Sequence, residues 1–482
     1  MVSKTYQKVE KEEISSKLFP EVRNLSKELE ELEKDEIVRL LEKLEKDFRE
    51  ISSSFYYSSP IVEYTIKEKE KEIKKYYISF DLKDLLLIAG ISGLSILLEG
   101  GTGIGKTTIA EMLMKAFFGK NYAFLQIDPS LSLEKFIDIN FGAIKDGKKL
   151  SDAIEKNKII DSPGVILDEI NRAPPTIVNL LQNYITNGRL VFEGGKEFYP
   201  GIYVDKNLVY QLKIATMNEG EKYSGTYELD KALRDRFAVQ INLDAFSPSR
   251  EDIRCIIRYG NAKIESEGKD NLQIVLTLFK KIREIPLDPW AEEFVIYCSR
   301  IDQCIRSPQG KKSTILSFTP RFCDGCSAAA LDKGICGNIS APSPRAIVDW
   351  IMLARGFALY RAYKFGGKAR VEIEDLIAAA PFTLYSKMDI NPSWIGKYCN
   401  GSKFEAYKEA LVTAFKRWKR GLEENEEIID KLDKGLQLTD EDYDKIKDYT
   451  LRDPWFFDVS CAIHAYRKLS ETKERNKKED RI

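Results

Sequence analysis

The residues best suited to chemistry lie in the segment GGTGIGKTT, which combines four glycines with one lysine and three threonines. It matches the pattern GxxxxGK[ST], in which glycine lets backbone N–H groups turn toward an anion because no Cβ blocks the approach. We expect Lys106 to reach the β- and γ-phosphates of a nucleoside triphosphate, and the Thr107 hydroxyl to bind Mg²⁺. The predicted nucleotide-binding residues are Gly100, Gly101, Thr102, Gly103, Ile104, Gly105, Lys106, Thr107 and Thr108.

Two adjacent carboxylates, Asp168 and Glu169, follow an apolar run in the segment GVILDEINRAPP. If that run is a buried parallel strand, both carboxylates lie at its carboxyl end, where open α/β sheets bind ligands. We expect Asp168 to hold the magnesium ion, and Glu169 to orient and polarise the water molecule that attacks the γ-phosphate. An Asp-Glu pair is common by itself, but downstream of a phosphate-binding loop it indicates nucleotide hydrolysis.

Three further polar residues lie beside later apolar runs. Asn218 ends the run QLKIATMN, as either an ordinary strand end or a group that holds the attacking water or the γ-phosphate from the opposite side. Arg234 and Arg236 precede the run FAVQ. They are either surface residues without a ligand, or arginine fingers that offset transition-state charge at a neighbouring subunit's nucleotide.

The elements that must position these residues alternate from residue 81 onward. Runs that are apolar throughout indicate strands buried on both faces, so the predicted fold class is α/β, with a parallel sheet covered by helices. After Pro248 the apolar runs become helical, which indicates a separate helical domain. The predicted strands are in SILLEG, YAFLQID, GVILDEI, QLKIATMN and FAVQINLD.

The N-terminal part of the chain has a different pattern. In residues 1–52, apolar residues recur at helical spacing and predict one long amphipathic helix or a helical pair, which packs on the protein's own core or binds a partner. Residues 52–60 break the helix, and the next twenty alternate apolar and charged residues as a β-hairpin does. We therefore predict an N-terminal extension, a core, a helical lid and a helical C-terminal extension, at residues 1–80, 81–247, 248–388 and 389–482.

Composition excludes several classes of protein. The 75 Lys+Arg and 76 Asp+Glu residues give a formal charge of -1, so no global charge draws the chain toward nucleic acid or an anionic membrane. No apolar run of about eighteen residues is present, and the N-terminal segment is too charged for a secretory signal, so we expect a cytoplasmic protein with no membrane partner. One histidine, His464, leaves little room for histidine-based catalysis. The charged fraction, 31%, is typical of thermophiles, in which ion-pair networks cost less.

Taken in order, these segments resemble AAA+ ATPases of the MoxR branch, the group that also includes the CbbQ, NorQ and GvpN types. The resemblance covers residues 81–388. Besides the phosphate-binding loop it rests on DEINRAPP, LQIDPSLSLEKFID, ATMNEGEKYSGTYELDKALRDRF and PSPRAIVDWIMLARGFALYRAYKFGGKARVEIEDL. It implies a P-loop AAA+ core followed by an α-helical lid, hydrolysis of ATP with Mg²⁺, and a homohexameric ring.

The resemblance also implies roles for single residues. Asn218 takes the first sensor position, and Arg345, in SPRA, takes the second and reaches from the lid to the γ-phosphate. Arg236 matches the finger position better than Arg234, although both can act on the neighbouring subunit. Gln126 sits where such proteins place a polar residue that restrains the catalytic glutamate until a substrate engages.

The biological role is implied by the resemblance alone. Segments 141–161 and 189–201 match an insert in the second helix and a hairpin that family members point toward a central pore. Such rings act as chaperone-like remodellers or assembly factors for a protein client, often one with a von Willebrand factor A domain, which this chain lacks. A nucleic-acid motor is the competing hypothesis, but the lysines of the insert only slightly outnumber its acidic residues, so nucleic acid is not favoured. The third hypothesis is a structural protein that ATP locks into an assembly.

One part of the lid departs from the family pattern. Residues 294–300, FVIYCSR, resemble a strand, and a long cysteine-containing segment separates them from SPRA. Its CxxC motif, with Cys336 and either Cys298 or Cys304, would suit a four-thiolate Zn²⁺ site, although the second CxxC of a typical zinc site is missing. A disulfide and free thiols are the alternatives. The candidate zinc ligands are Cys304, Cys323, Cys326 and Cys336.

Overall fold

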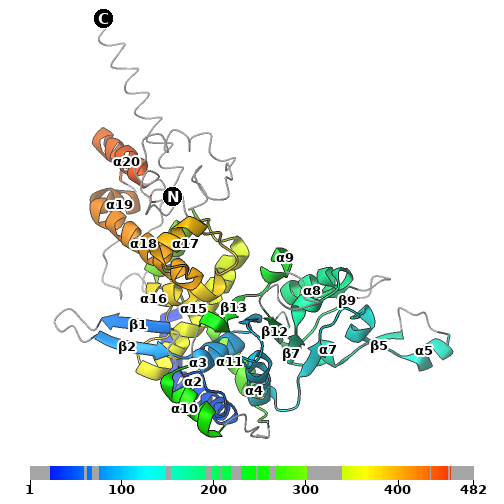
Figure 1. Ribbon diagram of the computed structural model, residues 1–482. Coiled ribbons are helices and arrows are strands. Elements are labelled where there is room, and N and C mark those ends of the chain that lie inside the picture. Colours follow the sequence, from blue (N-terminus) through cyan, green and yellow to red (C-terminus); the bar gives the residue numbers. More distant parts are fainter. Residues whose placement is uncertain are drawn as a thin grey trace, which may run out of the picture. The chain divides into compact units, whose positions relative to one another are not determined.

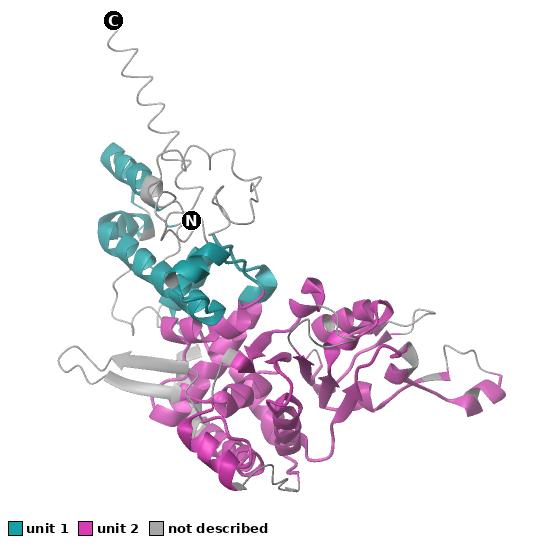
Figure 2. Ribbon diagram, in the orientation of Figure 1, with its two compact units in different colours: residues 1–31, 287–347, 387–482 teal, residues 32–286, 348–386 magenta. Residues whose placement is uncertain are grey.

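The chain separates into two compact units (Figure 2), composed of residues 32–286 with 348–386, and of residues 1–31 with 287–347 and 387–482. The body formed by residues 32–286 and 348–386, magenta and labelled unit 2 in Figure 2, holds the sheet and is called the first unit below, and the teal body, labelled unit 1, is called the second unit. The first unit includes residues 32–80, which the sequence pattern sets apart as an extension. The computed structural model describes residues 22–58, 62–67, 75–147, 153–191, 197–206, 208–218, 229–245, 248–259, 268–300, 339–434, 436–453 and 456.

The sheet of the first unit has five parallel strands in the order β13-β3-β12-β7-β4 (Figure 1). Each predicted apolar run forms one of these strands, so the α/β fold class is confirmed. The strand that leads into GGTGIGKTT is β3, between β13 and β12, and the strand that ends in Asp168 is β7, between β12 and β4. The bounds are β3 (Ile96–Gly100), β4 (Ala123–Gln126), β7 (Gly164–Asp168), β12 (Leu212–Asn218) and β13 (Val239–Asn242).

Successive side chains of a strand point to opposite faces of the sheet, and the strands are apolar on both, so helices cover both faces. One set of strand residues, including Leu97, Leu167 and Met217, joins a buried apolar cluster with α7 (Lys158–Asp161) and α8 (Pro175–Asn187). The helix α4 (Lys106–Phe118) packs on β3, β7 and β12. It approaches β7 so closely that a Cβ on Gly164 would lie 2.5 Å from Met114 Sδ. Close packing against β7 therefore fixes the position of α4, the helix that follows the phosphate-binding loop.

Insertions extend the core at two places. Between β4 and β7 the chain forms η2 (Leu133–Phe136), β5 (Ile137–Ile139), α5 (Phe141–Lys145) and β6 (Ile154–Lys156). Figure 1 shows α5 at the far end of the β5–β6 pair, away from the sheet. Between α8 and β12, the predicted hairpin pairs β8 (Leu190–Val191) with β9 (Glu197–Phe198), and an unpredicted one pairs β10 (Ile202–Asp205) with β11 (Leu208–Tyr210). Short helical turns follow or precede the strands at η3 (Ile170–Arg172), α9 (Lys231–Arg234) and η4 (Leu243–Ala245).

Residues 1–21 of the predicted helical region lie outside the described residues, and residues 22–51 form one helix, α2 (Val22–Ile51), followed by the predicted hairpin of β1 (Val62–Lys67) and β2 (Lys75–Phe80). Its last turns bury Leu41, Leu44 and Phe48 almost completely. Burying one such side chain contributes about 1.5 to 3 kcal/mol. The apolar stripe of α2 is therefore used within the protein's own core.

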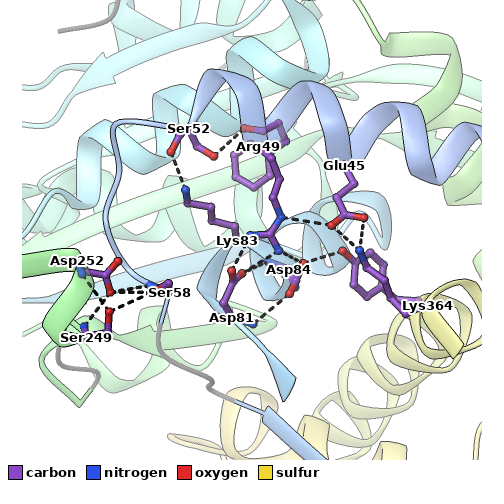
Figure 3. Close-up of polar contacts among 12 residues, drawn as sticks. Glu45, Arg49, Ser52, Ser58, Asp81, Lys83, Asp84, Ser249, Asp252 and Lys364 are labelled. Atoms are coloured by element: carbon purple, nitrogen blue, oxygen red, sulfur yellow. Dashed lines mark hydrogen bonds and ion pairs between the residues drawn. The ribbon is translucent and has the colours of Figure 1, made fainter. Parts of the chain in front are cut away.

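Ion pairs attach α2 to two other helices of the same unit, α3 (Leu82–Ile91) and α15 (Pro344–Phe365) (Figure 3). The Arg49 guanidinium lies 2.6 Å from Asp81 Oδ2 and 2.5 Å from Asp84 Oδ1, at the start of α3. Glu45 Oε2 lies 2.5 Å from Lys364 Nζ on α15. One helix from the N-terminal extension thus bridges the core and a helix of the predicted lid.

The rest of the first unit is helical. α10 (Arg250–Tyr259) and α11 (Leu272–Glu284) follow β13, and α11 packs against α3 and α4. Trp350 Nε1 on α15 donates a hydrogen bond of 2.6 Å to the Leu376 carbonyl on α16 (Ile373–Thr383). Helices from the predicted lid therefore share one compact unit with the sheet.

The second unit contains α12 (Pro289–Ser299), and the strand-like reading of residues 294–300 is wrong. A helix forms here because Pro289 occupies its first turn and Asp288 Oδ1 accepts the N–H of Trp290 at 2.9 Å. Phe294 packs edge to face against Phe415, at 5.9 Å between ring centroids. The other helices are α17 (Pro392–Tyr398), α18 (Lys403–Glu424), α19 (Glu426–Asp433) and α20 (Asp440–Arg452). Among all described helices, none is long and apolar enough to cross a membrane.

Candidate active site

The loop between β3 and α4 has the backbone that phosphate binding requires. Gly103 and Gly105 have φ angles of 84° and 88°, in the left-handed region that glycine adopts at little cost. At Gly105 a Cβ would also lie 2.8 Å from Phe55 Cε2, so this position suits glycine for two reasons. Gly103 and Thr108 are exposed. The loop is therefore open to a ligand, and the N-terminal N–H groups of α4 point at the same place.

The ammonium group of Lys106 lies over this loop, where it donates to the carbonyl oxygens of Gly100 at 2.9 Å and Gly101 at 2.5 Å. Burial lowers the pKa of Lys106, and the charges of Asp244 and Asp168 oppose that change. Asp244 was not identified from the sequence; its Oδ2 accepts the Gly101 N–H at 2.8 Å. Phosphate oxygens would favour the charged form of the lysine that burial disfavours.

Hydroxyl groups from two elements converge on Asp168 at the end of β7. Thr107 Oγ1, in the first turn of α4, and Thr216 Oγ1, on β12, each donate to Asp168 Oδ1 at 2.7 Å. Thr216 Oγ1 also accepts the Glu169 N–H at 3.0 Å. Thr107 and Asp168, which the sequence assigns to magnesium, are therefore adjacent.

Strand order brings two amide side chains to Glu169. Gln126 ends β4 directly beside Asp168, and Asn218 ends β12 on the other side of β7. Gln126 Nε2 donates to Glu169 Oε2 at 3.1 Å, and Asn218 Nδ2 donates to Oε1 at 3.2 Å. Glu169 has φ 57° and ψ 48°, a left-handed conformation that is rare outside glycine and that occurs at functional sites.

A third side chain, that of Arg172, reaches the Glu169 carboxylate, and no sequence pattern singled it out. Arg172 Nη2 donates to Glu169 Oε1 at 3.2 Å, and Nε lies 3.0 Å from Oε2. Asn171, in the same turn, donates through Nδ2 to the Asn218 carbonyl at 3.2 Å. The available signal was the spacing of three between Glu169 and Arg172 in DEINR, but that spacing indicates a contact only once the chain is known to turn directly after Glu169.

The three arginines predicted from the sequence lie in different places. Arg234 Nε is 3.4 Å from Glu99 Oε1 of the same chain, a fully buried carboxylate at the end of β3. Arg236 is partly exposed just before β13. Arg345 is exposed in the first turn of α15, and it belongs to the second unit, whereas the phosphate-binding loop belongs to the first.

The donor set of this site fits a magnesium ion bound together with a nucleotide. No group of three or more His, Cys, Asp or Glu suited to a metal occurs among the described residues. One hydroxyl and one carboxylate, Thr107 and Asp168, suit Mg²⁺, which keeps several waters and takes further ligands from phosphates. The candidate zinc ligands Cys304, Cys323, Cys326 and Cys336 lie outside the described residues. Cys298 is buried in α12 as a free thiol, and burial raises its pKa.

Comparisons with known proteins agree with this geometry. Residues 95–237 match the family described as AAA domain (dynein-related subfamily). Chaperone MoxR1 of Mycobacterium tuberculosis is 29% identical over 329 residues, which cover 67% of this chain and 76% of that protein. The ATP-dependent protease ATP-binding subunit-like protein AmiB of Pseudomonas aeruginosa is 31% identical over 140 residues. That match covers 27% of this chain and only 36% of AmiB, so it spans little more than a third of that relative.

A solved structure shares the fold. The crystal structure of a proposed ATPase from Cytophaga hutchinsonii aligns with a TM-score of 0.54 and 19% identity, over 80% of this chain and 98% of that one. The loop geometry, the order of the five parallel strands, the matched family and MoxR1 all agree. Residues 95–237 therefore form an AAA+ ATPase domain, and the chain is similar to Chaperone MoxR1 over two thirds of its length.

Proposed function

We propose that the protein is a ring-forming, chaperone-like remodeller or assembly factor that couples ATP hydrolysis to a change in a protein client. The similarity to Chaperone MoxR1 supports this proposal most strongly, because it extends over 67% of the chain, well beyond the nucleotide-binding core. Because the sequence resembles the MoxR branch, whose clients often carry a von Willebrand factor A domain, a cytoplasmic protein with such a domain is the client that we propose to test first.

The helix α5 is the part of the core best suited to a protein client. Phe141 and Ile144 are 69% and 37% exposed there, at the end of the projecting β5–β6 pair. Exposed apolar side chains on a projecting element suit an apolar peptide segment better than a phosphate backbone. The insert, residues 141–161, holds five lysines and four acidic residues, so its charges nearly cancel.

The catalytic roles follow from the site. Lys106 and the N–H groups of the loop would hold the triphosphate, and a magnesium ion held by Thr107 and Asp168 would neutralise charge on the transferred group. Glu169 would accept the proton of the attacking water, and Asn218 would help to orient it. Arg236 of an adjacent subunit and Arg345 would contact the γ-phosphate, so a ring completes the site and loss of that phosphate would change the contacts between subunits.

The proposal is tested by asking what stimulates ATP hydrolysis by the full chain. Candidate von Willebrand factor A proteins and an unfolded model protein are compared with single- and double-stranded DNA and RNA, at low and high salt. We expect a protein to raise kcat. We also expect Phe141→Ser with Ile144→Ser to remove that stimulation while basal hydrolysis remains, whereas Lys145→Ala, on the same helix, retains both.

Two results would favour the competing hypotheses. Stimulation by nucleic acid with a steep dependence on salt would identify a nucleic-acid motor. Tight ATP binding with negligible turnover, in the presence of every protein tested, would identify an assembly protein that ATP locks.

A further inference from the structure

The turn that follows β7 places an arginine over the catalytic carboxylate. Glu169 precedes the 3₁₀ helix Ile170–Arg172, and the Arg172 N–H donates to the Glu169 carbonyl at 2.9 Å. Across this turn the Arg172 guanidinium reaches the Glu169 carboxylate, with Nε 3.0 Å from Oε2. The backbone of Glu169 is left-handed, a strained conformation for a residue other than glycine, and it occurs where the strand gives way to this turn.

Both oxygens of Glu169 are contacted twice in this arrangement. Oε1 accepts from Arg172 Nη2 at 3.2 Å and from Asn218 Nδ2 at 3.2 Å. Oε2 accepts from Gln126 Nε2 at 3.1 Å and lies 3.0 Å from Arg172 Nε. A general base needs a free lone pair within hydrogen-bond distance of the water whose proton it takes. A carboxylate surrounded in this way is poorly placed to accept that proton.

We propose that Arg172 is a positioning residue that holds Glu169 in a resting state, and that hydrolysis requires the guanidinium to release at least one carboxylate oxygen. A partly exposed ion pair contributes little to the stability of a fold, so a gain in stability does not by itself explain the pairing of Arg172 with Glu169. Asn171 joins the same turn to the Asn218 carbonyl at the end of β12, so a shift of that strand end would move Arg172 as well. The inference concerns the ATPase site and does not depend on the client.

The test measures kcat and KM for MgATP without any client, in the full chain. Arg172→Gln and Arg172→Met remove the charge, whereas Arg172→Lys keeps it but can contact only one oxygen. Arg254→Gln is the matched control, because Arg254 pairs with Glu251 at the same spacing on the surface of α10. We expect the neutral variants to raise kcat several-fold with KM unchanged, the lysine variant to fall between them and the unaltered chain, and the control to change neither.

Thermal unfolding and equilibrium binding of ATP establish which variants are folded. A folded variant of Arg172, including the lysine variant, that hydrolyses ATP no faster than the unaltered chain overturns the proposal, because Arg172 would then support the productive position of Glu169 or act only in folding. A rise in kcat that also occurs in Arg254→Gln would likewise overturn it.

Discussion

At the scale of single residues, the proposed mechanism assigns Glu169 as the base. Glutamine has nearly the same shape but cannot accept the proton of the attacking water. We therefore expect Glu169→Gln to bind ATP as tightly as the unaltered chain while kcat falls by about 100-fold or more. Phosphate release and equilibrium binding of ATP measure the two effects. Glu111→Gln, a half-exposed position on α4, is the control, and a normal rate in Glu169→Gln would refute the assignment.

Gly105 tests the loop itself. In Gly105→Ala the left-handed backbone costs about 1 to 2 kcal/mol, and the added Cβ would meet the Phe55 ring, which lies 2.8 Å from its position. We expect both the free energy of unfolding and the affinity for ATP to decrease. Gly103→Ala has the same backbone cost but no atom within 4 Å of its Cβ, so it should lose less stability. Replacing Phe55 with alanine in the Gly105→Ala chain should restore part of the loss; no difference between the two glycine variants would argue against the contact.

At the scale of elements, α2 is attached through Glu45. Burial would raise the pKa of Glu45, but the hydrogen bond and charge of Lys364 outweigh it and hold this pKa below its usual value. A carboxylate whose pKa is lower in the folded chain than in the unfolded chain stabilises the folded state at neutral pH. This contribution begins to decrease below pH 4.5, the usual pKa, and is lost once the pH has fallen through the lowered pKa of the folded chain.

The corresponding variant is Glu45→Gln. At pH 7 we expect its free energy of unfolding to fall by about 1 to 2 kcal/mol, because the Lys364 ammonium loses its charged partner. Denaturant unfolding at a series of pH values should show this difference shrinking below pH 4.5, where Glu45 becomes protonated first in the unfolded chain and then, at its lowered pKa, in the folded chain. Glu36→Gln, an exposed position on the same helix, should show neither effect. A difference that stayed constant with pH would mean that charge is not the cause.

At the scale of the whole molecule, the proposed site is completed by a second copy. We expect Lys106→Ala subunits to lose ATP binding but still to supply Arg236, and Arg236→Ala subunits to bind ATP but to lack the proposed finger. Each is expected to be inactive alone, and mixing them should restore part of the hydrolysis. The recovered rate is measured against the mixing ratio, with sedimentation showing that mixed oligomers form.

Arg234 provides the matched comparison for that experiment. Its guanidinium contacts Glu99 of its own chain, so any loss in Arg234→Ala arises within one subunit. Mixing Arg234→Ala with Lys106→Ala should therefore restore no activity. If mixed oligomers form but Arg236→Ala recovers no hydrolysis, Arg236 does not act in trans. If both arginine variants recover hydrolysis equally, the trans role does not belong to Arg236 alone.

The sequence by itself determined the features that depend on neighbouring residues. These features are GGTGIGKTT, the apolar runs of the five strands and the hairpin at β1 and β2. Each is a local pattern, because backbone freedom and burial on both faces determine the residue types within a short segment. The strand-like reading of residues 294–300 failed because a short apolar run suits a buried helix equally well, and the cap at Asp288 decided the outcome.

Only the tertiary structure decided which side chains meet. Placing β7 between β12 and β4 brings Asn218 and Gln126 to the two oxygens of Glu169, although the three residues are far apart in the chain. The left-handed turn at Glu169 brings Arg172 over it, and the pairing of β3 with β13 sets Arg234 near Glu99. These contacts depend on strand order and on backbone angles, which no local sequence pattern records. The sequence could therefore single out Glu169 as a candidate base, but not its contact with Arg172.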